Sequence, residues 1–444
     1  MDRRIVLAAV AAIILVSSSL GGGGSAARAG DTATSTAAAT SAAARAGGVA
    51  AAAASVTVAS NHSDPVEKVA FKAMMDACAA STGVTPKVTT YDHRKFQDTI
   101  TAYLKGKPAD VFTWFGGELM RSLVRQRLVR PISDVWTGIS GDYSAAIKAA
   151  STAADGKQYI VPIYTYPWVF MYRKSLFADK GYAVPTTLAE LITLAKRMQA
   201  DGIVPIAFAD KDGWPAMGTF DILDMRLNGY AFHMKLMAGT AKWTDPRVKA
   251  VFVLWKKILP YMQPGALGRT FQQGTQAMVD KKAGMYFIGT FAADQVTDPA
   301  VFNDLGLFAF PTLGTAYDAE MAVDAPIDGL MLSRSPKNLA GARAILACAS
   351  TGAAQLAYLA MAPTRVAANR NADTSAYGDL QKQTATILAG SKKIAQFLDR
   401  DTRADFAGPA GMQRYLKSFI ASPNQDLSAL MRRIQAYWAS LPPQ

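Results

Sequence analysis

The sequence predicts a globular α/β protein of two or three domains. Short β-like runs alternate with longer helical patterns from residue 56 onward, and such alternation is typical of a parallel sheet with helices on its faces. Half of the residues are apolar, which is enough for a sizeable core in a chain of this length. Apart from one stretch at the N-terminus, no apolar run approaches the roughly twenty residues that cross a bilayer.

The first 29 residues have the order of a secretory signal peptide. Arg3 and Arg4 precede an apolar run at residues 5–16, and small residues follow. Ala27 to Ala29 offer an Ala-x-Ala-like cleavage site. The apolar run is shorter than the roughly twenty residues of a membrane-spanning helix. We therefore expect an exported protein without a transmembrane anchor, secreted or otherwise extracytoplasmic, in the periplasm or at the cell surface.

We expect neither a lipid attachment site within the signal peptide nor a packed core in the segment that follows it. Gly23 stands where a bacterial lipoprotein has its lipidated cysteine, so we expect the product to be released. Residues 30–55 consist almost wholly of Ala, Gly, Ser and Thr. Such a composition cannot bury enough apolar surface to offset the entropy of ordering, which predicts a flexible linker.

The net charge is high but spread out. Lys and Arg number 47 against 34 Asp and Glu, a formal charge of +13. An excess of this kind can indicate nucleic acid, a membrane surface or an acidic matrix as partner. The basic residues here are dispersed among acidic ones, and no basic block with interleaved aromatics is present. We expect a solvated basic surface and no nucleic-acid partner.

Cys78 and Cys348 lie far apart in helix-like apolar patterns. Export would permit a disulfide between them, but the sequence gives no distance. The pattern slightly favours two buried free thiols.

The first βα stretch contains three predicted strands and two predicted helices. A helix is expected at 65–81, with Asp64 as its cap and Pro65 in its first turn. The elements in order are a strand at 56–59, this helix, a strand at 87–90, a helix at 93–105 and a strand at 110–114. Ligands usually bind at the carboxyl ends of such strands. Those ends are residues 61–64, 91–93 and 114–118.

A second βα stretch begins after Pro162. Strands are expected at 167–172, 204–208, 285–288, 307–310 and 322–332, and helices at 187–200, 219–237, 246–258, 272–281 and 337–360. From residue 373 onward the pattern predicts helix throughout.

Catalytic motifs are absent from the sequence. It has no phosphate-binding Gly-rich loop, no Gly-x-Ser-x-Gly elbow and no His-Glu-x-x-His. The residues from Asp210 to Gly213 resemble a calcium loop, but the required Gly falls at Pro215. Because His62, His93 and His233 lie in separate segments without metal-ligand spacing, we expect no metal and no cofactor. A carboxylate pair for glycoside hydrolysis needs no local motif.

Six segments of the chain resemble, in the same order, those of the family 1 extracellular solute-binding proteins of bacterial ABC importers. They are KPADVFTWFGGEL at 107–119, DGKQYIVPIYTYPWVFMYRKSLF at 155–177, PTTLAELITLAKRMQADGIVPIAF at 185–208, KDGWPA at 211–216, KWTDP at 242–246 and FQQGTQAMVDKKAGMYFIGTFAAD at 271–294. Leu188 replaces the Trp that is usual in the third segment.

The resemblance implies a two-lobed, periplasmic-binding-protein-like α/β fold with a hinge between the lobes. Ligand would bind in the cleft, and hinge motion would close the lobes on it. The first lobe would comprise 56–162 with 322–363, and the second 163–321 with 364–444. The resemblance further implies a monomer that is no enzyme, binds a sugar, oligosaccharide or polyol of the carbohydrate type, and delivers it to ABC importer membrane subunits.

Sugar binding requires aromatic faces and paired polar groups. The aromatic candidates for the cleft are Trp114, Phe115, Tyr166, Trp168, Trp214, Phe271 and Phe291. Phe271 and Phe291 occupy positions where many sugar-binding relatives carry Trp. The polar candidates are Asp92, His93, Glu118, Gln272, Asp324, Asp328 and Arg365. Aromatics at strand ends are also common in cores, and each charged residue is as well suited to be a surface charge or a helix cap.

Two other classes of function stay open at this point. A secreted glycoside hydrolase or transferase on a similar scaffold would show paired carboxyls, one with a raised pKa. A wall-associated protein would bind anionic polymer through its positive charge in a salt-sensitive manner.

Overall fold

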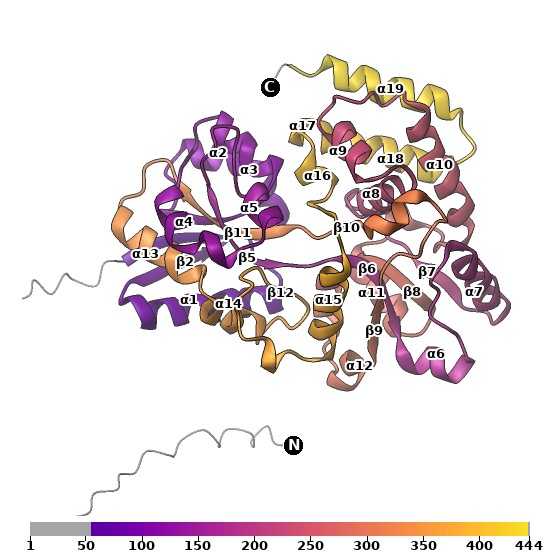
Figure 1. The fold of residues 1–444 in the computed structure, drawn as a ribbon, viewed down its shortest axis with the longest axis horizontal. Coiled ribbons are helices and arrows are strands. Elements are labelled where there is room, and N and C mark those ends of the chain that lie inside the picture. The colour runs from indigo at the N-terminus through magenta and orange to yellow at the C-terminus, as the bar shows by residue number, and fades with distance from the viewer. Residues whose placement is uncertain (1–54, 443–444) are drawn as a thin grey trace, which may run out of the picture. The chain divides into compact units, whose positions relative to one another are not determined.

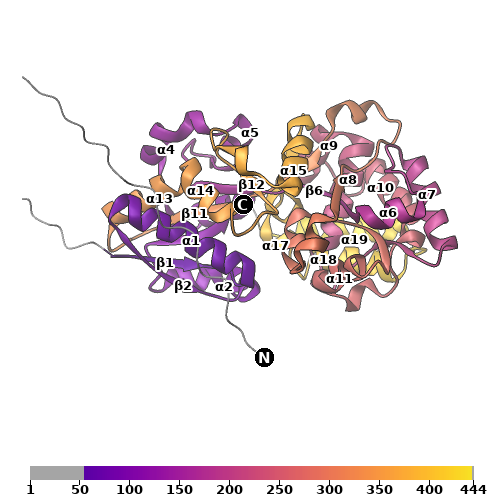
Figure 2. The same ribbon diagram turned by 90° about the horizontal axis from the view of Figure 1, so that it is seen from below.

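The computed structural model describes residues 55–442. The predicted signal peptide and the predicted linker up to residue 54 lie outside the described residues. Within 55–442 no helix is long and apolar enough to cross a membrane. These residues form two lobes, each built on its own β-sheet, as Figure 1 and Figure 2 show. The predicted two-lobed α/β fold is therefore confirmed.

A seven-stranded sheet forms the base of the first lobe. Its strands are β1 (Ser55–Ser60), β2 (Thr85–Thr90), β3 (Val111–Phe115), β4 (Val129–Arg130), β5 (Ile160–Thr165), β11 (Ile327–Ser333) and β12 (Val366–Ala367). The order is β12-β5-β11-β3-β1-β2, and β4 pairs with β11. β1 is parallel to both β2 and β3, as the predicted βαβαβ order requires, whereas β11 is antiparallel to β3 and β5.

Helices cover both faces of this sheet. They are α1 (Pro65–Thr82), α2 (His93–Lys105), α3 (Glu118–Arg125), α4 (Ser133–Ile139), α5 (Ala145–Ala150), α13 (Leu339–Ala349) and α14 (Gly352–Leu359). Val56 and Val58 of β1 pack in one buried cluster with α1, α13 and α14, while Ala59 packs in another with α2 and α3. This alternation follows from the two-residue period of a strand. The single helix predicted at 337–360 is interrupted, because Thr351 caps a new helix through Ala354 N–H.

The second lobe is built on a four-stranded sheet. Its strands are β6 (Trp168–Arg173), β7 (Val204–Ala207), β8 (Ala283–Gly289) and β9 (Leu305–Phe308), in the order β7-β8-β6-β9. Its helices are α6 (Lys174–Lys180), α7 (Leu188–Ala200), α8 (Pro215–Asn228), α9 (Tyr230–Met237), α10 (Pro246–Ile258), α11 (Phe271–Val279), α12 (Pro299–Asn303), α15 (Asp379–Gly390), α16 (Leu398–Asp401), α17 (Ala404–Ala407), α18 (Met412–Ala421) and α19 (Leu427–Ser440).

Two predictions for the second lobe are wrong in detail. The helix expected at 219–237 is broken at Gly229, whose φ of +84° favours glycine, and the ring of Tyr317 lies where a Cβ would stand. The C-terminal part is not helical throughout. Residues 394–395 form β13 (Ile394–Ala395), which pairs in parallel with β10 (Val323–Asp324).

The chain passes between the two sheets more than once. β5 reaches Thr165 in the first sheet, and β6 begins at Trp168 in the second. Residues 163–165 and 366–367, which the predicted limits assign to the second lobe, pair with strands of the first sheet. The limits of the lobes themselves stay a prediction.

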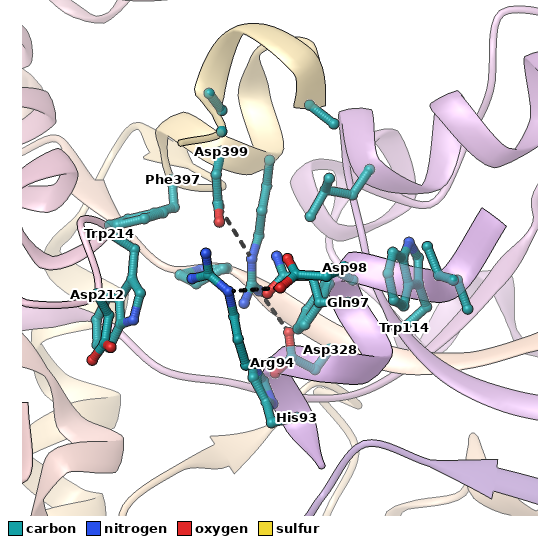
Figure 3. A pocket seen from close by; sticks show the side chains of 18 of the residues that line it. His93, Arg94, Gln97, Asp98, Trp114, Asp212, Trp214, Asp328, Phe397 and Asp399 are labelled. Atoms are coloured by element: carbon teal, nitrogen blue, oxygen red, sulfur yellow. Dashed lines mark hydrogen bonds and ion pairs between the residues drawn. The ribbon is translucent and has the colours of Figure 1, made fainter. Parts of the chain in front are cut away.

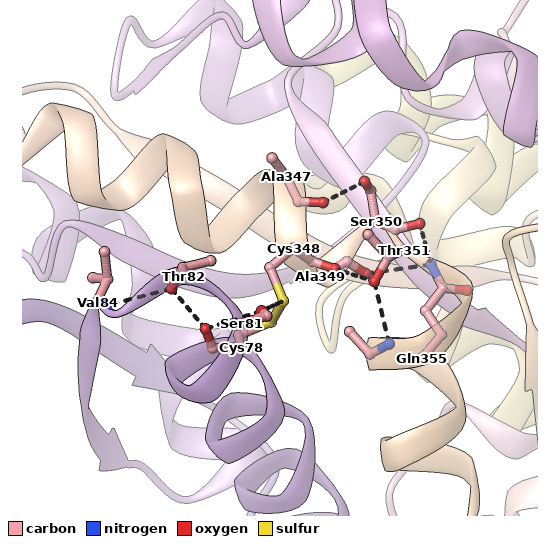
Figure 4. Close-up of a disulfide and its surroundings, with 11 residues drawn as sticks. Cys78, Ser81, Thr82, Val84, Ala347, Cys348, Ala349, Ser350, Thr351 and Gln355 are labelled. Atoms are coloured by element: carbon pink, nitrogen blue, oxygen red, sulfur yellow. Dashed lines mark hydrogen bonds between the residues drawn. A yellow bond between two sulfur atoms is a disulfide. The ribbon is translucent and has the colours of Figure 1, made fainter. Parts of the chain in front are cut away.

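Cys78 of α1 and Cys348 of α13 form a disulfide (Figure 4). Their Cα atoms are 5.6 Å apart, which is within disulfide range. The preference for two free thiols is therefore wrong, because tertiary packing brings together two helices that are distant in sequence. The bridge closes a loop of 270 residues.

Buried acidic side chains form a cluster in the second lobe. Asp221, Asp224 and His233 are fully buried, and Asp324 of β10 lies with them. His233 Nδ1 lies 3.0 Å from Asp224 Oδ2, while His233 Nε2 is 3.9 Å from Asp221 Oδ1. Within the described part of the chain, neither carboxyl oxygen of Asp324 has a hydrogen-bond partner. Burial raises the pKa of Asp324 to about 8.

Replacing both cysteines, as C78A/C348A, should destabilise the first lobe. Removing a bridge that closes so long a loop costs about 2–5 kcal/mol, so the unfolding temperature should fall by roughly 5 °C or more. Calorimetry measures the change. A thiol reductant should lower the unfolding temperature of the natural chain but not that of the variant. Two free thiols in the unreduced natural chain would contradict the disulfide.

Asp324→Asn should stabilise the protein in a pH-dependent way. The Asp324 pKa is raised in the fold, so its contribution is fully present below the unfolded pKa near 4 and is lost as pH rises to about 8. The variant should match the natural chain near pH 4 and melt several degrees higher at pH 8. Asp76→Asn, at an exposed ion pair with Lys72, serves as control. A gain that is independent of pH would contradict the assignment.

Candidate functional site

A cavity of about 480 Å³ is lined by residues of both lobes (Figure 3). The first lobe contributes the N-terminal part of α2, the end of β3 and part of α3. The second lobe contributes the start of β6, the loop before α8, the start of α11 and residues between 397 and 413. The carboxyl ends of parallel strands therefore meet this cavity, as expected for α/β sheets.

Most of the predicted site residues lie around this cavity. Twelve of the fourteen line it: Asp92, His93, Trp114, Phe115, Tyr166, Trp168, Trp214, Phe271, Gln272, Phe291, Asp328 and Arg365. The structure brings these side chains together from eight segments of the chain. Whether each of them touches a ligand stays a prediction.

Glu118 and Asp324 do not line the cavity. Glu118 is the first residue of α3, where a carboxylate is favoured by the helix dipole, and it pairs with Arg125 at the other end of the same helix. Asp324 is fully buried in the acidic cluster of the second lobe. The structure therefore does not bring these two residues to the cavity, and sequence position alone does not distinguish a helix-terminal or a buried carboxyl from a cleft residue.

The first lobe presents polar groups beside two rings. The Asp92 carboxylate caps α2 by accepting from Lys95 N–H at 2.8 Å. His93 follows it and meets Phe115 edge-on, with ring centroids 5.8 Å apart. Trp114 packs beside Phe115, with centroids 5.0 Å apart. In the described structure, the buried Trp114 Nε1–H has no acceptor.

The second lobe presents a wall of rings, which we call the aromatic wall: Trp168, Trp214, Phe271, Phe291 and Phe397. Trp214 has its centroid 6.1 Å from Trp168, 5.5 Å from Phe271 and 5.9 Å from Phe291. Phe397 stacks on Trp168, with centroids 4.8 Å apart and planes inclined by 25°. The rings thus form a continuous apolar surface on one side of the cavity.

An ion pair connects the two lobes across the cavity. Arg400 of α16 donates to Asp328 Oδ1 of β11 at 2.6 Å and to the Tyr166 hydroxyl at 3.0 Å. Its guanidinium also lies over the Phe115 ring, 4.3 Å from the centroid. Asp328 accepts a second bond, from the Tyr164 hydroxyl at 3.0 Å. Burial lowers the pKa of the neighbouring His62 to about 3, so its imidazole is neutral at physiological pH.

Arg365 is held by carboxylates from both lobes. Its guanidinium pairs with Glu67 of α1 and with Asp294 of the short helix η4 (Thr290–Gln295), each at 2.5 Å. The side chain is almost fully buried. These two ion pairs join the lobes through one buried guanidinium.

Several lining residues were missed by the sequence reasoning. They are Glu67, Arg94, Gln97, Asp98, Asp212, Phe397, Asp399, Arg400 and Gln413. Arg94, Gln97 and Asp98 lie on the first turns of α2 after the predicted site residues, so the helical period could have included them. Phe397 to Arg400 could not be found, because the pattern there predicted uninterrupted helix.

Charges around the cavity are mainly negative. Arg94 Nε lies 3.2 Å from Asp98 Oδ2, and Arg365 and Arg400 are paired as described. Asp399 Oδ1 is buried without a hydrogen-bond partner among residues 55–442. Burial raises the pKa of Asp399 and of Asp64. Within the same residues, no group of His, Cys, Asp and Glu has an arrangement that could hold a metal ion.

Comparisons with known proteins identify a family and several relatives with this architecture. The family model described as bacterial extracellular solute-binding protein matches residues 59–356. An uncharacterised ABC transporter extracellular-binding protein of Pyrococcus horikoshii is 26% identical over 193 residues, 43% of this chain and 44% of the relative. The diacetylchitobiose binding protein DasA of Streptomyces coelicolor is 26% identical over 223 residues, 48% of this chain and 50% of the relative. The chain thus spans half or less of the length of these curated relatives.

Among solved structures, the bacterial solute receptor AcbH superposes with a TM-score of 0.85 at 39% identity. The match covers 87% of this chain and 99% of AcbH. The lobes, the cavity between them and the extent of the family match lead to one conclusion: the chain belongs to the family of bacterial extracellular solute-binding proteins.

Proposed function

We propose that this chain is the extracytoplasmic receptor of an ABC importer and that it captures a neutral sugar in the cavity between its lobes. The observation that carries the proposal is the aromatic wall opposite a carboxylate-rich polar surface. The receptor would act as a monomer, without cofactor, and would pass its ligand unchanged to the membrane subunits. Its fold and family support this role, and the chemistry of the cavity supports the ligand class.

The aromatic wall suits the apolar faces of a sugar ring. Trp214, Phe271 and Phe291 are half-buried rings at the cavity, and the buried pair of Trp168 and Phe397 backs them from two further segments of the chain. Small-molecule sites typically combine such apolar area with a few placed polar groups, in volumes of roughly 300–1,000 Å³. The cavity of about 480 Å³ falls within this range.

The polar surface suits hydroxyl groups. Asp92, Gln97 and Asp399 provide acceptors, and the unpartnered Trp114 Nε1–H provides a donor. Hydrogen bonds to charged groups contribute about 1.5–3 kcal/mol each. Micromolar affinity needs only about 8 kcal/mol in total, so three or four such bonds together with the rings would be sufficient.

The charge of the cavity argues against an anionic ligand. The arginines that line it are already paired with carboxylates, and Asp92, Asp212 and Asp399 add further negative charge. A sugar phosphate or sugar acid would meet these groups without a free arginine to pair with. Neutral sugars and polyols avoid this repulsion.

AcbH gives the first ligand to test, since it is described as having an exclusive preference for β-D-galactopyranose. The diacetylchitobiose that DasA binds gives a second. A monosaccharide fits the proposal better, because the cavity of about 480 Å³ lies at the lower end of the usual range for small-molecule sites.

A glycoside hydrolase is the second candidate function. Asp64 and Asp399 line the cavity, and burial raises the pKa of each, which is the property of a general acid. Asp399 lies 3.8 Å from Arg400 Nε, so its carboxylate also has a structural role.

D-galactose should raise the unfolding temperature of residues 30–444, while galactose 1-phosphate should not. A ligand at a hundredfold excess over its Kd stabilises by about 2.7 kcal/mol, which a thermal shift assay detects. Diacetylchitobiose, glucose and polyols complete the panel. Chromatography should recover the bound sugar unchanged. Formation of a new product at a rate that Asp399→Asn removes would establish the hydrolase instead.

Trp214→Ala should weaken sugar binding at least about tenfold, a loss of about 1.4 kcal/mol, because Trp214 is a half-buried ring on a loop that lines the cavity. The unfolding temperature without ligand should change little. Trp438→Ala is the control, since Trp438 packs on the second-lobe core outside the cavity. Unchanged affinity with a large loss of stability would make Trp214 a core residue.

A further inference from the structure

Phe397 has a backbone conformation that almost only glycine adopts. Its φ is +98° and its ψ is 144°. The other non-glycine residues with positive φ among those described are Arg127, Lys281 and Met321, with φ between 44° and 59°. Those values belong to the ordinary left-handed region, whereas that of Phe397 lies outside it. Such a conformation persists only where the surroundings enforce it.

Two carboxylates hold the chain on either side of Phe397. The N–H of Gln396 donates to Asp401 Oδ2 at 2.6 Å, and the N–H of Leu398 donates to Asp221 Oδ2 at 2.7 Å. Asp221 comes from the middle of α8 and is fully buried. The Phe397 carbonyl accepts from the N–H groups of Arg400 and Asp401 at 2.8 and 2.9 Å. The peptide group between Phe397 and Leu398 is therefore held at both its carbonyl and its N–H, and the bond to Asp401 holds the peptide group that precedes Gln396.

This fixed backbone directs the Phe397 ring into the aromatic wall (Figure 3). The ring stacks on Trp168. Trp168 in turn lies against α8 at Gly218, where a Cβ would collide with the indole. The same helix thus supports Trp168 through Gly218 and fixes Phe397 through Asp221.

We propose that Asp221 and Asp401 are positioning residues that impose the strained backbone of Phe397, so that its ring completes the ligand-binding wall with Trp168. The contribution to ligand affinity rests on the proposed function, whereas the imposed strain does not. The two carboxyls act as hydrogen-bond acceptors here, and an acceptor needs no negative charge. Since burial raises the pKa of both groups, an amide that keeps the oxygen should replace either one.

The strain is tested without ligand by comparing Phe397→Gly with Phe397→Ala. Both variants lose the ring, so their packing losses nearly cancel. In ordinary backbone Gly is less stable than Ala, but here Phe397→Gly should melt about 2–5 °C above Phe397→Ala. Adding Asp221→Ala and Asp401→Ala to each should abolish this difference, because the backbone is then free to relax. Equal unfolding temperatures in the otherwise natural chain would refute the imposed strain.

The effect on binding is tested by titrating the same variants with D-galactose. Asp221→Ala or Asp401→Ala should weaken binding at least about tenfold, while Asp221→Asn and Asp401→Asn should stay within about threefold. In the Phe397→Ala background, adding Asp221→Ala should cause less than about a threefold further loss. A merely structural carboxylate would lower affinity equally in both backgrounds, and that result would overturn the positioning role.

The stability comparison and the binding titration together distinguish the proposed function from the proposed positioning role. If the natural chain binds no D-galactose or other sugar of the panel, the proposed function fails, and the Gly–Ala comparison alone decides on the imposed strain. If sugar binds but the Asp→Ala variants keep full affinity, the proposed function stands and the positioning role is wrong.

Discussion

Buried ion pairs join the two lobes beside the cavity. Arg400 of the second lobe reaches Asp328 of the first, and Arg365 joins Glu67 to Asp294. Taking such groups out of water is expensive, and their mutual attraction offsets this only when each hydrogen bond is made. Under the proposed function, closing the lobes would exchange hydration for ion pairs, so the net preference for the closed arrangement would be small. A ligand that contacts both lobes can then shift the balance with modest binding energy.

Each lobe contributes a different set of side chains to the cavity. The second lobe carries the aromatic wall, while the first lobe carries Asp92, His93 and the indole N–H of Trp114. The first lobe adds the Phe115 ring beside Trp114, and the second lobe adds Gln272 and Asp399, so a sugar between the lobes would meet rings and polar groups on both sides. Under the proposed function, a sugar would reach all of these groups at once only between closed lobes, which would couple its capture to that conformation.

Much of the fold could be predicted from local sequence patterns, whereas the detailed arrangement of the site could not. Pro65 and Gly83 set the two ends of α1, and the helix at 246–258 has the predicted bounds. Trp114 could be predicted because it lies at the carboxyl end of a strand, and Trp168 because it follows the expected passage between the lobes. The pairing of Cys78 with Cys348 was not, since it depends on how α1 and α13 pack and no local signal encodes that distance.

Many of the residues between 397 and 413 line the cavity, yet the sequence did not predict their structure. The composition of this segment suits a helix, but Phe397 departs from helical backbone because buried carboxylates, one of them distant in sequence, bind its neighbours' amides. Residues held in such conformations cost about 1–3 kcal/mol, and the unpartnered Asp324 adds a further cost nearby. Both lie in the lobe that bears the aromatic wall, while the disulfide stabilises the other lobe. The aromatic wall is thus held in place by groups that cost stability, as expected when a binding surface is maintained at the expense of its scaffold.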